Sequence, residues 1–168
     1  MSIVVGYTLP KFNLTGSVIM LKQEKGLLIV DLQNGFHPSP ELVFGISAFA
    51  ESFQTIVMTR FTNLENSLYR TVLDWNEDGG NLVLNFPKAI ILEKCGYGLS
   101  TLHLEKMKDL HCTEWHVCGL ETDACVLACC FSLWDAQMRP IFHPSLCESP
   151  LHKEGVSIAF RQFGNNKE

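Results

Sequence analysis

Five short, almost continuously apolar runs recur along this chain, and their spacing constrains its fold more than any other feature. The runs read GLLIVD (26–31), TIVMTR (55–60), AIILEK (89–94), WHVCGL (115–120) and RPIFHP (139–144). Such runs are typical of strands buried on both faces of a parallel sheet. Segments of helical character lie between or after them, at 41–53, 101–110, 122–137 and 151–163. Because strands that alternate with helices indicate βαβ units with right-handed crossovers, we predict a three-layer α/β fold.

The chain has the size and composition of one globular domain. Its 168 residues are 46% hydrophobic and 18% charged, and a chain of this length can bury roughly 70% of its surface. We assign residues 1–168 to a single domain, with residues 1–24 as an extension that could add an edge hairpin or strand. The formal net charge of −5 argues against nucleic acid or an anionic membrane as partner, because both require a basic face. A small neutral or weakly charged substrate remains compatible with it.

The seven cysteines of the chain raise the question of a disulfide framework. Their number is odd, most of their neighbours are apolar, and the first twenty residues lack the charged and apolar regions of a signal peptide. We therefore expect a cytoplasmic protein with reduced thiols. In that setting the cysteines are small buried residues, a metal site, or one reactive thiol among bystanders.

Polar residues follow three of the predicted strands. Asp31 ends the first, Lys94 ends the third, and Cys125 follows the fourth, in the first turn of the helix predicted at 122–137. The chemistry of an open parallel sheet lies beyond the carboxyl ends of its strands. We therefore expect an acid, an amine and a thiol to meet at one edge of the sheet.

Each of these three residues also has a structural explanation. Cys125 could simply pack the helix against the sheet, Asp31 could cap the next loop, and Lys94 could reach solvent from a strand end. The functional interpretation depends on the combination. A thiol at a helix N-terminus is favoured as thiolate, with backbone N–H groups nearby to receive an oxyanion. A carboxylate can take the thiol proton, and an ammonium favours the negative charge, so together they suit a cysteine hydrolase.

Three ordered segments, IVDLQNGF, EKCGYGLS and VCGLETDACVLACC, resemble the signature segments of the isochorismatase-like cysteine hydrolase superfamily. This group includes N-carbamoylsarcosine amidases and nicotinamidases. The resemblance implies a Rossmann-like fold with a six-stranded, mostly parallel sheet, assembled as a dimer or tetramer. It makes Asp31 the general base, Lys94 its cationic partner and Cys125 the nucleophile, and it places His152 at the usual histidine position. It also implies a cis peptide bond between Leu120 and Glu121, which would turn the Glu121 N–H toward an oxyanion hole shared with the Cys125 N–H.

One departure from the pattern bears on the substrate. Nicotinamidases carry a histidine-containing metal site after the second strand, but no histidine lies between His37 and His103 here. We therefore expect no metal and no other cofactor, and the chain is similar to a metal-free branch. Arg60 and Asn63 could bind a carboxylate or an amide in the pocket, or could equally form a surface salt bridge and a turn. Gln33, Phe36 and Tyr97 complete the expected pocket.

The sequence thus predicts a cysteine-dependent hydrolase of C–N bonds in a small amide, carbamoyl or ureido substrate, acting through a Cys125 thioester. Three alternatives remain open. The chain could be a non-catalytic or regulatory small-molecule-binding protein of the same fold, or a vinyl-ether hydrolase. It could also be a thiol redox protein that pairs Cys125 with Cys129, although helix geometry would strain that disulfide. The remaining cysteines are expected to be packing residues.

Overall fold

The computed structural model describes residues 24–149. The extension predicted at residues 1–24 lies outside the described residues except for Glu24, and so do the final predicted helix at 151–163 and His152. None of the helices in the described part of the chain is long and apolar enough to cross a membrane.

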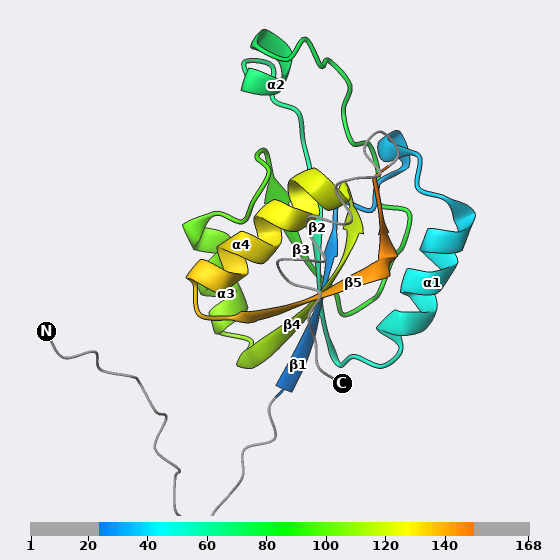
Figure 1. The fold of residues 1–168 in the computed structure, drawn as a ribbon, viewed down its shortest axis with the longest axis vertical. Helices are drawn as coiled ribbons and strands as arrows, with labels where there is room; N and C mark the ends of the chain where they lie inside the picture. The colour runs from blue at the N-terminus through cyan, green and yellow to red at the C-terminus, as the bar shows by residue number, and fades with distance from the viewer. Residues whose placement is uncertain (1–23, 150–168) are drawn as a thin grey trace, which may run out of the picture.

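A single parallel sheet forms the centre of the fold (Figure 1). It consists of β1 (Glu24–Val30), β2 (Thr55–Phe61), β3 (Ile90–Lys94), β4 (Cys112–Leu120) and β5 (Arg139–Glu148). The strands lie in the order β3-β2-β1-β4-β5, and each pairs in parallel with its neighbours. The predicted α/β class is therefore confirmed. The expected six strands are corrected to five among the described residues, because each of the five apolar runs forms one strand and no sixth run is present there.

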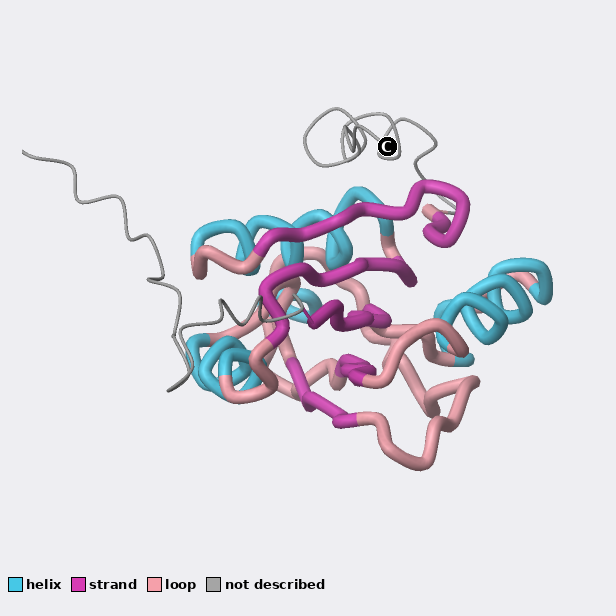
Figure 2. Tube along the Cα trace, turned by 90° about the horizontal axis from the view of Figure 1, so that it is seen from below, coloured by secondary structure: helices cyan, strands magenta, loops and turns pink. Residues whose placement is uncertain are grey.

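Helices cover both faces of the sheet. Figures 1 and 2 show α1 (Pro40–Ala50) on one side, and α3 (Thr101–Lys108) and α4 (Leu127–Asp135) on the other. This is the three-layer arrangement that right-handed crossovers produce when the strand order reverses. Ser39 caps α1 by accepting a hydrogen bond from the Leu42 N–H, and Ser100 caps α3 in the same way through the His103 N–H.

The core follows the central strand β1, on which every residue from Leu27 to Val30 is fully buried. Five of the cysteines are buried, as expected of packing residues: Cys112, Cys118, Cys129, Cys130 and Cys147. Cys95 is exposed, so the expectation that every cysteine other than Cys125 packs in the core is wrong at this position. Its exposure follows from its place just after β3, in the loop that leaves the sheet.

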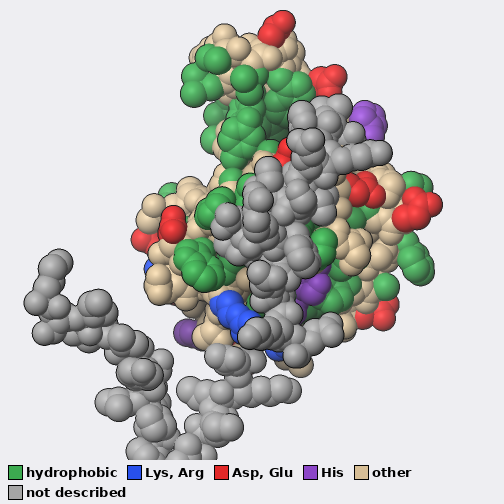
Figure 3. Space-filling model, in the orientation of Figure 1, with side chains coloured by type: hydrophobic (Ala, Val, Ile, Leu, Met, Phe, Trp, Pro, Cys, Tyr) green, Lys and Arg blue, Asp and Glu red, His purple; other side chains and the backbone are tan. Residues whose placement is uncertain are grey.

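The connection from β2 to β3 has no long crossover helix. Residues 62–89 instead form an arm, with only the short α2 (Leu68–Thr71), that projects beyond the sheet (Figure 1). In the space-filling view, hydrophobic side chains gather on this projection (Figure 3). Its exposed apolar residues include Leu64, Leu68, Val72 and Leu73. The arm lies beyond the carboxyl ends of the strands (Figure 1), and the strand order reverses between β1 and β4.

Candidate active site

Asp31 directly follows β1 and anchors the site. Its backbone has a φ of 45°, a left-handed conformation that turns the chain sharply at the end of the strand. Thr59, on the neighbouring strand β2, donates its hydroxyl to Asp31 Oδ1 at 2.6 Å and accepts a hydrogen bond from the Asp31 N–H at 3.0 Å. The carboxylate is almost fully buried and is held in one orientation by this pair of bonds.

Lys94, the last residue of β3, brings its ammonium group to the same point. Its Nζ lies 2.7 Å from Asp31 Oδ2 and donates to the carbonyl oxygens of Gly96 at 2.7 Å and Tyr97 at 3.2 Å. Burial opposes the charge of Lys94, but the interactions of its ammonium group, of which the negative charge of Asp31 is the strongest, outweigh burial and raise the lysine pKa. The lysine is therefore charged at neutral pH.

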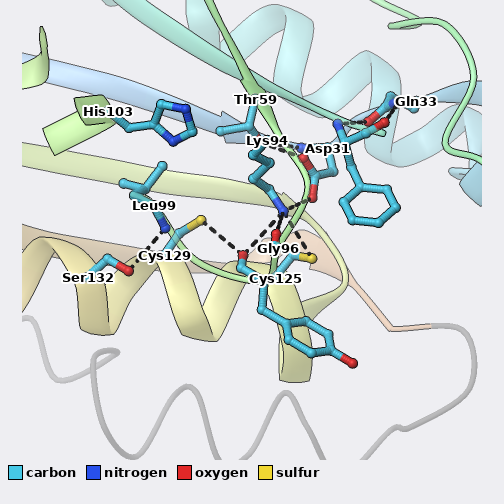
Figure 4. A network of polar contacts seen from close by, with 12 residues as sticks. Asp31, Gln33, Thr59, Lys94, Gly96, Leu99, His103, Cys125, Cys129 and Ser132 are labelled. Atoms are coloured by element: carbon cyan, nitrogen blue, oxygen red, sulfur yellow. Dashed lines mark hydrogen bonds and ion pairs between the residues drawn. The ribbon is translucent and has the colours of Figure 1, made fainter. Parts of the chain in front are cut away.

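Cys125 completes the cluster from η2 (Thr122–Val126), a π-helical turn that leads into α4. Its Sγ accepts a hydrogen bond from Lys94 Nζ at 3.3 Å, so the ammonium group contacts both the thiol and the Asp31 carboxylate. Figure 4 shows the three side chains converging from different elements. The structure thus brings together the acid, amine and thiol that the sequence placed at strand ends.

The resting state of the thiol differs from the sequence expectation. Burial, followed by the charge of Asp31, raises the pKa of Cys125 to about 12, although Lys94 acts in the opposite direction. The predicted preference for thiolate is therefore wrong for the free protein. Its physical reason is that burial and a neighbouring carboxylate together outweigh the helix terminus and the lysine.

The peptide bond between Leu120 and Glu121 is trans, because no cis peptide bond occurs among the described residues. The cis bond implied by the resemblance is thus corrected. Glu121 has an extended backbone, with φ −79° and ψ 136°, and its carbonyl accepts the N–H groups of Ala124 at 3.2 Å and Val126 at 3.0 Å. This turn begins without the free-energy cost of a non-proline cis bond. An oxyanion hole at the N–H groups of Glu121 and Cys125 stays a prediction.

A cavity of about 680 Å³ opens beside Cys125. Asp31, Leu120, Glu121 and Cys125 line it, together with the two predicted pocket residues Phe36 and Tyr97. The arm contributes further lining residues that the sequence analysis did not single out as pocket residues, although the sequence predicts that the loop at 60–73 shapes the pocket: Tyr69, Leu73, Trp75 and Glu77. Their signal in the sequence is weak, because an aromatic residue in a long connection has no periodic pattern to place it.

Three of the predicted pocket residues lie outside the cavity lining. Gln33 is fully buried and exchanges hydrogen bonds with the backbone of Phe61, donating at 3.0 Å and accepting at 2.7 Å. Asn63 donates to the carbonyl oxygens of Trp75 at 3.0 Å and Glu77 at 2.8 Å. Arg60 is exposed and pairs with Glu93 through a 2.9 Å hydrogen bond. Gln33 and Asn63 therefore fix the backbone of residues that line the cavity. Arg60 forms a surface ion pair, which is one of the two roles that the sequence analysis considered for it.

Cys129, the suggested redox partner, is fully buried below the site. Its Sγ donates to the Tyr97 carbonyl at 3.7 Å, and burial raises its pKa well above the ordinary value of a thiol. This contact fits a packing role. The described residues contain no group of three or more His, Cys, Asp or Glu side chains arranged to hold a metal ion.

The fold and the site define an α/β protein with a buried carboxylate–lysine–cysteine cluster at the point where its strand order reverses. No protein-family model matches the sequence, and no curated protein matches it. Solved structures do match it. A pyrazinamidase of Pyrococcus horikoshii, crystallised with zinc, has a TM-score of 0.72 at 19% identity, over 83% of this chain and 93% of that one.

Two further solved structures give the same result. An isochorismatase-like hydrolase from Alkaliphilus metalliredigens has a TM-score of 0.71 at 12% identity, over 83% of this chain and 90% of that one. An N-carbamoylsarcosine amidase from Thermoplasma acidophilum has a TM-score of 0.70 at 17% identity, over 84% of this chain and 93% of that one. The likeness supports the resemblance drawn from the three sequence segments. It shows that this chain has the fold of the isochorismatase-like hydrolases.

Proposed function

We propose that this protein is a cysteine amidohydrolase that cleaves the C–N bond of a small amide, carbamoyl or ureido compound. One observation carries the proposal. The ammonium of Lys94 lies between Asp31 Oδ2 at 2.7 Å and Cys125 Sγ at 3.3 Å, at a cavity large enough for a small molecule. Amidases among the solved structures of the same fold add support.

The high pKa of Cys125 assigns Asp31 the first step. Because the thiol rests protonated, it must lose its proton as it attacks the carbonyl carbon. We assign that proton to Asp31, the carboxylate that shares the Lys94 ammonium with the thiol. A C–S bond forms and the carbonyl oxygen becomes an oxyanion. As the proton moves, the negative charge shifts from the Asp31 carboxylate to the Cys125 sulfur, and the positive charge of Lys94 stabilises it at both places. This role requires the lysine to stay charged, which its raised pKa ensures.

Collapse of the tetrahedral intermediate breaks the C–N bond. The proton held by Asp31 passes to the departing nitrogen, which leaves as ammonia or an amine, and a thioester remains on Cys125. Asp31 then takes a proton from a water molecule that attacks this thioester. The C–S bond breaks, the acid is released and the thiol regains its proton, so the cycle needs no redox partner.

The buried cluster favours this function over a purely binding role. A lysine and an aspartate whose side chains are each 1% exposed are costly to desolvate, and a hydrophobic pair would often be as stable. Proton transfer to and from the neighbouring thiol explains directly why a charged lysine and aspartate are buried beside this cavity. The cytoplasmic location and the dimer or tetramer remain predictions.

The test is ammonia release from a panel of small amides and ureides by the wild-type protein. Cys125→Ala should abolish turnover, whereas Cys95→Ser, which removes an exposed thiol outside the cavity lining, should leave it unchanged. With a slow substrate, intact mass spectrometry should detect an acyl adduct on wild type that the Ala variant lacks. Ammonia release by Cys125→Ala would overturn covalent catalysis.

A further inference from the structure

Aromatic side chains form much of the cavity wall. The rings of Phe36 and Trp75 stack at a centroid distance of 6.1 Å and an interplanar angle of 22°. Tyr69 packs edge-on against Tyr97, with centroids 4.9 Å apart, and also against Trp75 at 5.7 Å. All four residues line the cavity that contains Cys125. A ligand in this cavity is therefore surrounded by several aromatic side chains at once.

The charges of the lining are predominantly negative. Besides Asp31, whose charge Lys94 offsets, the carboxylates of Glu77, Glu121 and Asp123 line the cavity, and no Lys or Arg in residues 24–149 does so. Ser149 Oγ lies within hydrogen-bonding distance of a carboxylate oxygen of Glu121 and of one of Asp123, so these two carboxylates flank the same hydroxyl.

We infer that the site takes an amide or carbamoyl compound whose other end carries a permanent positive charge, such as a quaternary ammonium group. This inference rests on the proposed function and narrows it to a substrate class. Aromatic rings attract cations through their negative faces, and the attraction strengthens when the cation is desolvated. The carboxylates extend the attraction over a longer range and repel an anionic substrate.

The aromatic residues and the carboxylates predict different ligand preferences, and this difference makes the inference testable. Rings alone would favour any flat or apolar group, including a neutral one. The excess of carboxylates is what selects a cation over a neutral molecule of the same shape. The decisive comparison is therefore between ligands that differ in charge and not in size.

Three small amides provide that comparison. Trimethylglycinamide carries a quaternary nitrogen, 3,3-dimethylbutanamide replaces that nitrogen with carbon, and malonamate carries a carboxylate. Their dissociation constants are measured by calorimetry on Cys125→Ala at pH 8, where histidine side chains carry little charge. We expect the cation to bind at least about fivefold more tightly than its neutral isostere, and the anion to bind most weakly. Equal or tighter binding of the neutral amide, or no binding of the cation, would overturn the inference.

Substitutions of the carboxylates test their part directly. Glu77→Gln and Asp123→Asn should each reduce the ratio of cation to neutral affinity by about threefold, with little effect on the neutral amide. Glu93→Gln is the matched control, because this exposed carboxylate lies on β3 outside the cavity lining. A ratio that stays unchanged in both cavity variants would contradict the electrostatic argument. Circular dichroism checks that each variant is folded.

Turnover of the same three amides by the wild type separates the two proposals. If Cys125→Ala prefers the cation but the wild type hydrolyses none of the three amides and nothing in the wider panel, the proposed function fails, while the preference of the cavity for a cation stands. If the wild type hydrolyses the neutral or anionic amide with the highest kcat/KM, the hydrolase proposal stands and the charge preference is wrong.

Discussion

Lys94 and Asp31 form an ion pair of 2.7 Å in which each side chain is only 1% exposed. Lys94 is the last residue of β3, and Asp31 directly follows β1. Strand β2 lies between these two strands in the sheet. The pair therefore spans the width of β2, whose Thr59 also contacts Asp31. Because neither charge is accessible to water, each depends on the other for its compensation.

Removing one member of this pair should be much more damaging than removing both. Lys94→Met leaves a buried carboxylate without its cation, and we expect the free energy of unfolding to fall by about 3–5 kcal/mol. The double variant with Asp31→Asn should recover a large part of that loss, because no buried charge then remains uncompensated. Urea denaturation measures both values. A double variant no more stable than Lys94→Met would show that the pair is not coupled in this way.

Thr59 should affect catalysis without touching the substrate, as a positioning residue for Asp31. Thr59→Val removes the hydroxyl that donates to Oδ1, and we expect kcat to fall by about tenfold to a hundredfold while KM stays close to the wild-type value. Thr59→Ser keeps the hydroxyl and should restore most of the rate. If Val and Ser lower kcat equally, loss of packing is responsible and the hydrogen bond is not.

The pKa of Cys125, about 12, gives a pH dependence with a definite sign. The thiolate is the reactive form, so alkylation of Cys125 by iodoacetamide should be slow at pH 7 and rise about tenfold per pH unit through pH 8 to 10. A cysteine in a short unfolded peptide, an unburied reference thiol, should level off around its ordinary pKa of about 8.5. Peptide mass mapping at each pH identifies the labelled residue. A plateau for Cys125 near neutral pH would instead indicate a resting thiolate.

Gly119 should be irreplaceable for a backbone reason. Its φ is +120°, and a Cβ at this position would lie 2.1 Å from the Val30 carbonyl oxygen, where β4 and β1 run side by side. We expect Gly119→Ala to lower the free energy of unfolding by about 2–4 kcal/mol. Gly96→Ala is the control, since its Cβ would meet nothing within 4 Å, and thermal denaturation should show a change within about 0.5 kcal/mol. Similar losses in both variants would count against the steric argument.

The sequence predicted the order and position of the strands better than the protonation state of the buried thiol. Apolar runs place the strands, and parallel strands end at one edge, so the meeting of Asp31, Lys94 and Cys125 followed from topology. The state of the Cys125 thiol did not follow, because it depends on how deeply the residue is buried and how near Asp31 lies. Neither quantity is encoded in local sequence.

Polar residues near the site were the least predictable from sequence. Gln33 lies two residues after Asp31 and Asn63 lies two residues after the end of β2, yet both donate their amide N–H groups to backbone carbonyl oxygens of the arm and its base. Thr59 gave no distinctive signal, since a threonine in a strand is common. Whether such a side chain faces a ligand or the backbone is decided by tertiary contacts that a single sequence does not show.

The arm at residues 62–89 has a consequence for how this protein could diversify. The proposed reacting groups are fixed to the sheet and to the turn before α4, whereas several of the groups that would touch the rest of a substrate belong to a connection that carries no strand. An exchange of arm sequences between proteins of this fold could therefore change ligand preference while the bond-breaking apparatus is inherited intact.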